Sequence, residues 1–404
     1  MKIVVLKFGG TSVGTVDRIK KVANIIVGYV RKGFRVIVVS SAMSGTTNDL
    51  IKKSRNISNN FISSEYDVLV ASGEQVSCAL IAGRLNHMGH KSQSWMGWQI
   101  PILTEGEHRT SRINKINKRK IFDYLKSGGI PVITGFQGVN NNNRITTLGR
   151  GGSDASAIMF AKFFKAKKCV IFTDVEGVYT TDPNNFKNAK KIKIISYEEM
   201  LEMSSLGAKV MQPHSIQDAR LNRIEIDVKS SFVNRQGTSI TKRKNIFRNK
   251  TITGLTSTKN DAKVTLAGVK DKPGVAASVF KPLSQNYINV DMVVQTSSSN
   301  NRETDITFTI KSEDLSKTLK LIKQNKKIKY RDLIVNKNVS KVSIIGVGMV
   351  TTPGVTYRMF QTLANKGINI LVIATSEIKI SVLINKKNIK EAISALHKEF
   401  KLNS

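Results

Sequence analysis

The sequence contains almost no cysteine, which excludes proteins built on disulfide bonds. Cys78 and Cys169 are the two cysteines among 404 residues, so neither a disulfide framework nor a CxxC metal or redox motif is available. A chain of this kind fits a reducing compartment.

Long hydrophobic runs are absent as well. No uninterrupted apolar stretch approaches the ~20 residues that a helix needs to span a bilayer. The N-terminal segment MKIVVLKFGG sets a short apolar run directly against a glycine pair. This run is too short for a signal peptide, and no small-residue cleavage site follows it. We therefore expect a cytoplasmic protein with no membrane partner.

Acidic and aromatic residues are both scarce. Lys and Arg number 64 against 29 Asp and Glu, giving a net charge of +35, and aromatic residues make up 6%. Such a charge favours nucleic-acid binding. The basic clusters Lys115–Lys120 and Thr241–Lys250, however, lack the interleaved aromatic side chains of a base-stacking surface. Because Lys, Asn and Ile are all abundant, we interpret the charge as compositional drift. We expect no specific nucleic-acid partner, only non-specific RNA binding at low salt.

Strands and helices alternate in the first half of the chain. Hydrophobic residues make up 40% of the sequence, enough for a sizeable core, and the length suggests two or three domains. An apolar run at Ile3–Leu6, a helical pattern from Val16 to Val30 and a β-branched run at Val36–Val39 predict a βαβ unit. Further strands are expected at Ile130–Ile133 and Val170–Phe172. Polar and glycine-containing clusters follow these strands, at the edge where open α/β sheets bind ligands.

An internal repeat occupies the C-terminal part of the chain. Three pairs of segments carry it: Lys263–Val269 with Lys341–Val347, Pro273–Val275 with Pro353–Val355, and Tyr287–Val290 with Gly367–Ile370. Each copy predicts a small βαββαβ unit. A unit of this size gains stability by pairing with its neighbour.

Two glycine-rich motifs are candidates for anion binding. In Lys7-Phe8-Gly9-Gly10-Thr11-Ser12 the glycines allow backbone N–H groups to approach an anion, although a plain turn explains the same residues. In Leu148–Asp154, Ser153 or Asp154 could simply cap a helix. That explanation leaves out Gly-Arg-Gly-Gly, whose planar Arg150 can bind a carboxylate or phosphate with two hydrogen bonds.

Two further segments have equally simple alternatives. The segment Thr173–Pro183 follows a strand and could be a polar loop that ends at proline. In Ala71–Glu74 a lone carboxylate precedes an apolar stretch, where it could complement the dipole of a helix N-terminus.

Taken in order, the segments KFGGTSVG, SSAMSGTTNDL, ASGEQVS, TTLGRGGSDASA, FTDVEGVYTTDP and EMLEMSSLGAKV resemble those of the aspartate kinases (aspartokinases) of the amino acid kinase family. The C-terminal repeat is similar to the paired ACT domains of those enzymes. The resemblance covers essentially the whole chain. It implies an α/β amino acid kinase fold over residues 1–245, with a mostly parallel sheet between helical layers. A linker and entry strand would follow at 246–262, then two α+β ACT domains at 263–337 and 338–404.

The resemblance also implies a set of site residues. Lys7 and Asp154 would be catalytic, with Asp154 near the metal and the phosphates, where it organises Lys7. The residues that would bind aspartate are Ser41, Thr47, Glu74, Arg150 and Ser153. Those that would bind the nucleotide are Lys7, Phe8, Gly9, Gly10, Ser12, Thr173, Asp174, Tyr179, Asp182 and Lys209.

The sequence departs from the family pattern at two places. Asn184 stands where the family commonly has Arg after Asp-Pro, so no nucleotide contact is assigned to it. The run Ser44–Thr47 lacks an Asp that often precedes the two threonines.

The implied reaction is the ATP-dependent phosphorylation of the β-carboxylate of L-aspartate to 4-phospho-L-aspartate, the first step of lysine, threonine and methionine biosynthesis. The cofactors would be ATP and Mg²⁺, with the metal held mainly by the phosphates and no separate metal site. The acceptor carboxylate, with a reference pKa of about 3.9, is ionised at neutral pH and needs no general base. The five histidines lie outside the glycine-rich motifs: His87, His90, His108, His214 and His397.

The ACT resemblance implies feedback inhibition by lysine, threonine or both. The residues expected to bind the inhibitor are Gly274, Val275, Ala276, Asn289, Asp291 and Gln295 in the first copy, and Val355, Thr356, Asn369, Ser376, Glu377 and Ser381 in the second. Leu371 stands where the first copy has Asp291, so one copy alone could bind. We expect a homo-oligomer, a dimer joined through these repeats. No Met lies between Met211 and Met292 to start a separate regulatory subunit.

Three alternatives remain open at this point. A glutamate 5-kinase-like enzyme is disfavoured by the tandem repeat and the EMLEMSSLGAK segment. A degenerate kinase domain that serves as a scaffold for amino-acid-sensing repeats is disfavoured by Lys7, Arg150 and Asp154. A nucleic-acid binder is the third.

Overall fold

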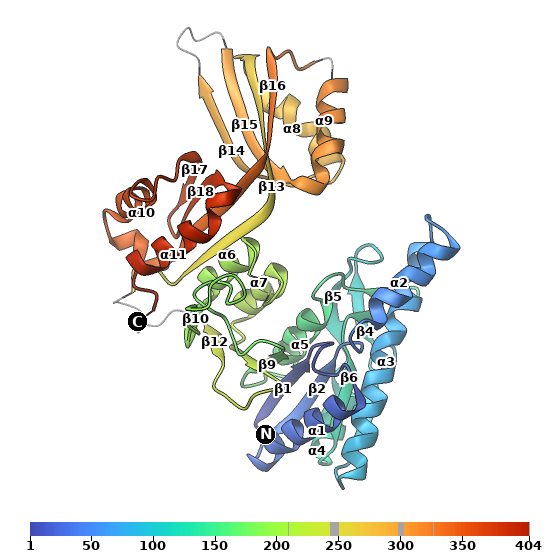
Figure 1. Cartoon of the computed structure of the whole chain (residues 1–404). Coiled ribbons are helices and arrows are strands. Elements are labelled where there is room, and N and C mark those ends of the chain that lie inside the picture. Colours follow the sequence, from blue (N-terminus) through green and yellow to red (C-terminus); the bar gives the residue numbers. More distant parts are fainter. Residues whose placement is uncertain (209, 243–249, 298–302, 326, 404) are drawn as a thin grey trace. The chain divides into compact units, whose positions relative to one another are not determined.

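The structure is a computed structural model that describes residues 1–208, 210–242, 250–297, 303–325 and 327–403. The chain forms two compact units (Figure 1). The first unit consists of Met1–Tyr179 and Lys191–Ile246, and the second of Thr180–Lys190 and Phe247–Ser404. The middle of the predicted loop Thr173–Pro183 therefore marks the point where the chain passes into the second unit.

An eight-stranded sheet forms the centre of the first unit, in the order β10-β12-β11-β9-β1-β2-β6-β3. Its strands are β1 Ile3–Phe8, β2 Arg35–Ser40, β3 Ser92–Trp95, β6 Ile130–Thr134, β9 Cys169–Thr173, β10 Ile194–Ser196, β11 Ile226–Ser230 and β12 Thr238–Thr241. Neighbouring strands run parallel except for β11 and β12. A four-stranded sheet, in the order β5-β4-β7-β8, consists of β4 Ile102–Glu105, β5 Arg112–Ile116, β7 Gln137–Val139 and β8 Ile145–Thr147.

Helices cover both faces of the large sheet. They are α1 Val16–Arg31, α2 Thr46–Ile57, α3 Ser63–His87, α4 Arg119–Lys126, α5 Gly152–Phe163, α6 Tyr197–Ser205 and α7 Pro213–Asn222. Val4, Leu6 and Phe8 of β1 are buried in one core with α1 and α3. Because side chains alternate along a strand, Lys7 points to the opposite face. On that face α5 packs against β1.

The two alternatives that invoked a helix start are wrong. Helix α5 begins at Gly152, its N-cap is the left-handed Gly151 with φ 72°, and no side chain caps it. Ser153 and Asp154 therefore lie in the first turn and do not cap the helix. Helix α3 begins at Ser63, so Glu74 lies in its interior, too far along the helix to complement the N-terminal dipole.

By length and composition, α3 alone among the described helices could cross a membrane. Half of its most apolar window is buried inside the protein, and it carries the buried carboxylates Asp67 and Glu74. A core helix of a water-soluble protein meets the same criteria, so this is weak support for a membrane span.

The second unit contains a six-stranded antiparallel sheet, in the order β14-β15-β13-β16-β18-β17. Its strands are β13 Gly254–Lys270, β14 Val290–Ser297, β15 Glu303–Lys311, β16 Asp332–Ile345, β17 Ile370–Ser376 and β18 Lys379–Asn385. Its helices are α8 Val275–Gln285, α9 Leu315–Gln324, α10 Val355–Ala364 and α11 Ile389–Glu399, with 3₁₀ turns η2 Ser312–Asp314, η3 Val347–Thr351 and η4 Lys386–Asn388. Helices α8 and α9 accompany the β14–β15 half, and α10 and α11 the β17–β18 half (Figure 1).

The two repeats share their long strands. In β13, Gly254–Thr258 pairs with the second half of β16, and Lys263–Ala267 pairs with the first half. Ile252 and Leu255 therefore belong to the core of the second repeat, although they precede the first. The predicted fold class, a mostly parallel sheet between helical layers followed by two α+β repeats, is confirmed. The repeat pattern could not reveal that the entry strand completes the second copy.

The segment Thr180–Lys190 is part of this second repeat. The Leu255 N–H donates to the Thr180 carbonyl at 2.6 Å, and the Thr180 hydroxyl lies 2.8 Å from His397 Nε2. The Phe186 and His397 rings lie 4.7 Å apart. Of the basic stretch predicted as a linker, residues 243–249 lie outside the described residues.

Candidate active site

A cavity of about 1110 Å³ opens at the carboxyl ends of β1 and β2. The predicted site residues that line it are Lys7, Gly10, Ser41, Thr47, Glu74, Arg150, Ser153 and Asp154. They come from four separate segments of the sequence, and the sheet topology brings them together at its ligand-binding edge.

An ion pair between Lys7 and Asp154 lies in the wall of this cavity. The Lys7 ammonium is 2.6 Å from Asp154 Oδ1, and the two side chains are 11% and 10% exposed. Lys7 comes from the end of β1 and Asp154 from the first turn of α5, so the pair joins the sheet to the helix. Because both side chains are largely buried, each charge acts on a ligand more strongly than it would at the surface.

The Lys7 loop lies close to the turn after β2. A Cβ atom added at Gly10 would be 2.9 Å from the Ala42 carbonyl oxygen, a separation that real Cβ atoms essentially never show. Glycine is required at position 10 because the backbone of this loop lies against the backbone at Ala42. A residue without a side chain also allows the close backbone approach to an anion that the motif predicts.

Glu74 presents a buried carboxylate with unused bonding capacity. Its Oε1 accepts a 3.1 Å hydrogen bond from the Ala42 N–H, whereas its buried Oε2 has no hydrogen-bond partner among the described residues. Burial raises the pKa of Glu74 to about 8. An orphaned carboxylate oxygen in a cavity wall favours a ligand that donates hydrogen bonds and carries positive charge.

Arg150 lies between two left-handed glycines, Gly149 and Gly151, each at φ 72°. Arg150 is exposed and lines the cavity, and no ion-pair partner for it occurs in the described part of the chain. The loop leads into α5, whose first N–H groups have no side-chain cap. This end of the cavity can therefore bind an anion.

The remaining residues of the first motif lie beside β9. The Ser12 hydroxyl donates to the Phe172 carbonyl at 3.4 Å and accepts from the Ser231 hydroxyl at 2.8 Å. The Gly9 N–H donates to the same Phe172 carbonyl at 3.1 Å. Phe8 is fully buried against Phe172, with ring centroids 4.8 Å apart. Only its backbone could therefore touch a ligand.

The other predicted nucleotide residues are spread over the chain. Thr173 ends β9 and Asp174 follows it, and the Thr173 hydroxyl donates a 3.1 Å hydrogen bond to the Asp174 carboxylate. Tyr179 pairs with Lys191 in the first unit. Asp182 belongs to the second unit, where it accepts from the Asn184 N–H at 2.9 Å and the Asn185 side chain at 2.7 Å. Lys209 lies outside the described residues.

Several cavity residues were missed by the motifs. Asn48, Ile51, Lys52 and Arg55 line the cavity from one face of α2. Their spacing of three and four residues was a readable helical signal. Arg109 also lines the cavity, but the sequence around it offers no comparable pattern.

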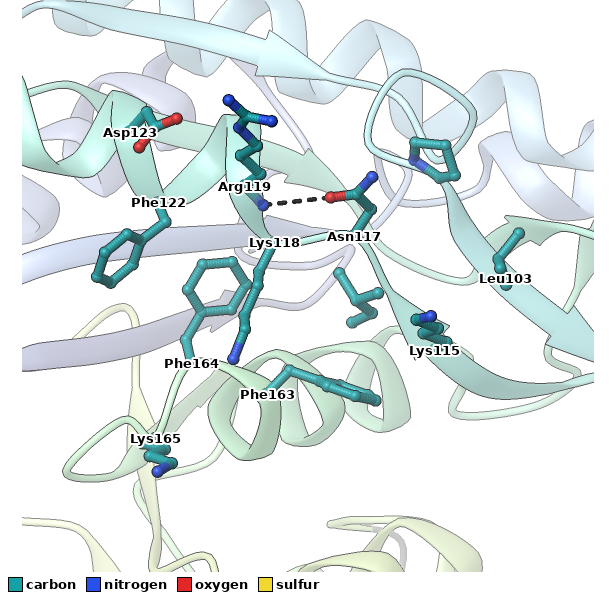
Figure 2. Close-up of a pocket in the computed structure, with 12 residues that line it drawn as sticks. Leu103, Lys115, Asn117, Lys118, Arg119, Phe122, Asp123, Phe163, Phe164 and Lys165 are labelled. Atoms are coloured by element: carbon teal, nitrogen blue, oxygen red, sulfur yellow. Dashed lines mark hydrogen bonds between the residues drawn. The ribbon is translucent and has the colours of Figure 1, made fainter.

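A second cavity, of about 800 Å³, contains none of the predicted site residues. Figure 2 shows the rings of Phe122, Phe163 and Phe164 around it, while the Arg119 and Asp123 side chains point away from these rings. Its lining surface is mainly apolar, and the residues predicted for catalysis lie in the first cavity, so that cavity is the candidate active site.

In the second unit, the two Pro-Gly turns have the same geometry. Gly274 and Gly354 are left-handed N-caps, at φ 89° and 84°, of α8 and α10, and neither helix has a side-chain cap. Val275 and Val355 are buried in the two cores, whereas Ala276 and Thr356 are more accessible. Eight of the predicted inhibitor residues are exposed: Gly274, Asn289, Asp291, Gln295, Thr356, Asn369, Ser376 and Glu377.

Two of the predicted inhibitor residues are already engaged. Asp291 forms an ion pair with Lys341, whose side chain is 5% exposed. The buried Ser381 hydroxyl lies 2.7 Å from that of Ser343. Asn289 lines a cavity of about 470 Å³ beside α8.

Comparison with known proteins agrees with the fold. Residues 2–230 match the amino acid kinase family, and residues 264–325 and 342–400 match an ACT domain. The chain is 41% identical to the aspartokinase of Geobacillus stearothermophilus over 402 residues, covering all of this chain and 98% of that one. It is 44% identical to the aspartokinase of Pseudomonas aeruginosa over 407 residues, with the same coverage.

Two solved structures of one enzyme are similar over almost the whole chain. They are E. coli aspartokinase III with aspartate and ADP in the R-state (TM-score 0.81, 26% identity, 98% of this chain and 99% of that one) and with lysine and aspartate in the T-state (TM-score 0.80, 26% identity, 99% and 100%).

The raised pKa of Glu74 predicts a pH-dependent stability. A carboxyl group that binds its proton more tightly in the folded state stabilises fully below its unfolded pKa of 4.5, and this contribution is lost as the pH rises through about 8. Glu74→Gln should therefore unfold at a higher temperature than the wild type at pH 9, and the difference should shrink at pH 5. Thermal unfolding at both values tests this. Glu65→Gln, an exposed change on the same helix, is the control. An equal difference at both pH values would contradict the assignment.

Proposed function

The chain belongs to the amino acid kinase family and, within it, to the aspartokinases, and from this premise we propose that it transfers the γ-phosphoryl group of ATP to the β-carboxylate of L-aspartate. One observation carries the proposal. A single cavity combines the buried Lys7–Asp154 ion pair with Arg150 and the Glu74 carboxylate. Among the residues that the structure describes, Arg150 has no ion-pair partner and Glu74 Oε2 has no hydrogen-bond donor. This is the charge pattern that complements an amino acid held beside a phosphoryl group.

The assignment of substrate groups follows from charge. Glu74 binds the ammonium group of aspartate through Oε2, and Arg150 binds the α-carboxylate with two hydrogen bonds. Ser41, Thr47 and Ser153 supply the remaining polar contacts. With both ends held, the β-carboxylate is the free group and faces Lys7.

The chemical step needs positioning and charge neutralisation more than proton transfer. An ionised β-carboxylate oxygen attacks the γ-phosphorus, the bond to the β,γ-bridging oxygen breaks, and ADP leaves with that electron pair. Lys7 neutralises charge on the phosphoryl oxygens while Asp154 holds its ammonium in place. The product is an acyl phosphate, 4-phospho-L-aspartate.

We assign the nucleotide to residues of the first unit, namely the Gly9–Gly10 loop, Ser12, Thr173, Asp174 and Tyr179. Within the described residues no cluster of three or more His, Cys, Asp or Glu could hold a metal ion. A single carboxylate, Asp154, beside the phosphates fits Mg²⁺, which is usually bound by one or two carboxylates plus substrate phosphates. When bound, Mg²⁺ neutralises phosphate charge.

ATP turnover with aspartate, and then with glutamate, tests the proposed function. ADP release, corrected for ATP hydrolysis in the absence of an acceptor, supports the proposal if it occurs with aspartate and not with glutamate. Release with glutamate alone would favour a glutamate kinase, and release with neither would favour a scaffold with amino-acid-sensing repeats.

Substrate binding gives a sharper prediction. Charge-assisted hydrogen bonds contribute ~1.5–3 kcal/mol each, so Arg150→Ala should raise the KM for aspartate by about tenfold or more. The KM for ATP should stay nearly unchanged. Steady-state kinetics with each substrate varied in turn separates the two constants. Equal increases in both would move Arg150 to the nucleotide.

Feedback inhibition extends the proposal to the second unit. The enzyme performs the first step of aspartate-derived amino-acid synthesis in the cytoplasm, as a homodimer joined through the ACT domains. Lysine, threonine or both inhibit it. The structure of E. coli aspartokinase III with lysine and aspartate supports lysine as an inhibitor of this chain. The N-terminal ends of α8 and α10 can bind the carboxylate of such an amino acid.

Inhibitor binding is tested most cleanly at the exposed residues. Gln295→Ala and Glu377→Ala should each weaken inhibition by lysine or threonine without changing uninhibited turnover, because a coupling of ~1–3 kcal/mol changes affinity about 5–150-fold. Asp291→Ala should also weaken inhibition, but it leaves the Lys341 ammonium buried and unpaired. Its unfolding temperature must therefore be measured alongside. Full activity of the wild type in millimolar lysine plus threonine would refute the regulatory proposal.

A further inference from the structure

Asp67 is a buried carboxylate that no sequence motif singled out. Its exposed fraction is 0%, and burying a charge costs free energy unless hydrogen bonds replace its water. Four donors do so here. Oδ2 accepts from His108 Nδ1 at 2.7 Å, the Arg109 N–H at 3.0 Å and the Thr147 N–H at 3.1 Å, while Oδ1 accepts from the Thr147 hydroxyl at 2.6 Å.

These donors belong to two loops that are distant from Asp67 in sequence. His108 and Arg109 lie 41 and 42 residues away, in the loop between β4 and β5, and Thr147, at the end of β8, lies 80 residues away. The Ser111 N–H donates to the Thr147 carbonyl at 3.0 Å. A single carboxylate thus joins both loops to α3.

One of the two loops carries Arg150. Thr147 is the last residue of β8, and Leu148, Gly149 and Arg150 follow it. A Cβ atom added at Gly149 would lie 3.0 Å from the Arg109 carbonyl oxygen, so the two loops are also packed closely against each other. The position of the Arg150 backbone therefore depends on Asp67 directly, through Thr147, and indirectly, through Arg109.

Helix α3 also carries Glu74. Asp67 and Glu74 are seven residues apart, about two helical turns, and lie on the same face. Because a helix is stiff over two turns, α3 sets the distance between the Glu74 carboxylate and the Arg150 loop that Asp67 holds. The distance between the two groups assigned to the ends of aspartate is therefore set through one helix.

We propose that Asp67 is a positioning residue for aspartate recognition, which fixes the Arg150 loop at the spacing from Glu74 that suits aspartate rather than its longer homologue glutamate. The inference rests on the proposed function. It adds a specificity role for a side chain that touches neither substrate nor nucleotide.

Kinetics of four variants tests this role. Asp67→Asn keeps the shape of the side chain but turns one acceptor oxygen into a donor, and Thr147→Val removes the hydroxyl that Oδ1 accepts. Thr147→Ser retains that hydroxyl as the conservative variant. Glu65→Gln, which breaks the exposed Arg144–Glu65 pair on the same helix, is the matched control.

Asp67→Asn should raise the KM for aspartate about tenfold or more, because it disrupts charge-assisted hydrogen bonds, while the KM for ATP stays within about twofold. The ratio of kcat/KM for aspartate to that for glutamate should fall at least about fivefold, since one methylene is worth ~10–200-fold in a shaped site. Thr147→Val should change both quantities in the same direction, Thr147→Ser should recover most of the loss, and Glu65→Gln should change neither.

Thermal unfolding shows whether each variant folds, and the kinetics of the folded variants then separate this role from a merely structural one. Equal increases in both KM values with an unchanged aspartate-to-glutamate ratio would overturn the proposal, as would wild-type kinetics in Asp67→Asn. If Asp67→Asn fails to fold, the comparison of Thr147→Val with Thr147→Ser decides by the same criteria. A wild type without aspartate turnover would instead refute the proposed function, and this role with it.

Discussion

The site depends first on the buried ion pair between Lys7 and Asp154. The phosphoryl donor and the carboxylate acceptor are both anions, so the protein must supply positive charge where they meet. Lys7 supplies it from the end of β1, on the sheet face that α5 covers. Asp154, in the first turn of α5, holds the ammonium at 2.6 Å. The parallel sheet, the glycine at position 10 and the start of α5 all serve to bring a cation and the positive end of a helix to one point.

Around that pair, α3 organises the amino-acid end of the cavity. Its two buried carboxylates differ in how well they are satisfied. Asp67 accepts four hydrogen bonds and holds loops. Glu74 has one oxygen without a partner in the described part of the chain, and its pKa is raised to about 8. The first arrangement is stable without a ligand. The second becomes fully satisfied when a cation binds, so the same helix provides a fixed support and a binding group.

Much of this could be predicted from the sequence, because the informative patterns were local. The strand at β1, the helix α1 and the Lys7 and Arg150 motifs each depend on residues within about one element. Helix α3 was misjudged, since it packs against helices and strands on several sides and so lacks an amphipathic period that would mark its start. Asp67 was missed because its partners are 41 to 80 residues away. The pairing of Gly254–Thr258 with the second repeat is likewise a long-range pairing that no local pattern encodes.

The central claim is that Lys7 and Asp154 act as one unit in phosphoryl transfer, and a double-mutant cycle on kcat tests it most directly. Lys7→Ala should lower kcat by ~10²–10³, as expected for the loss of one preorganised charge. Asp154→Asn should also lower it, and the double variant should be no more than about threefold worse than the more damaging single change, since residues that act together are not additive. Effects of the two changes that multiply in the double variant would contradict the account.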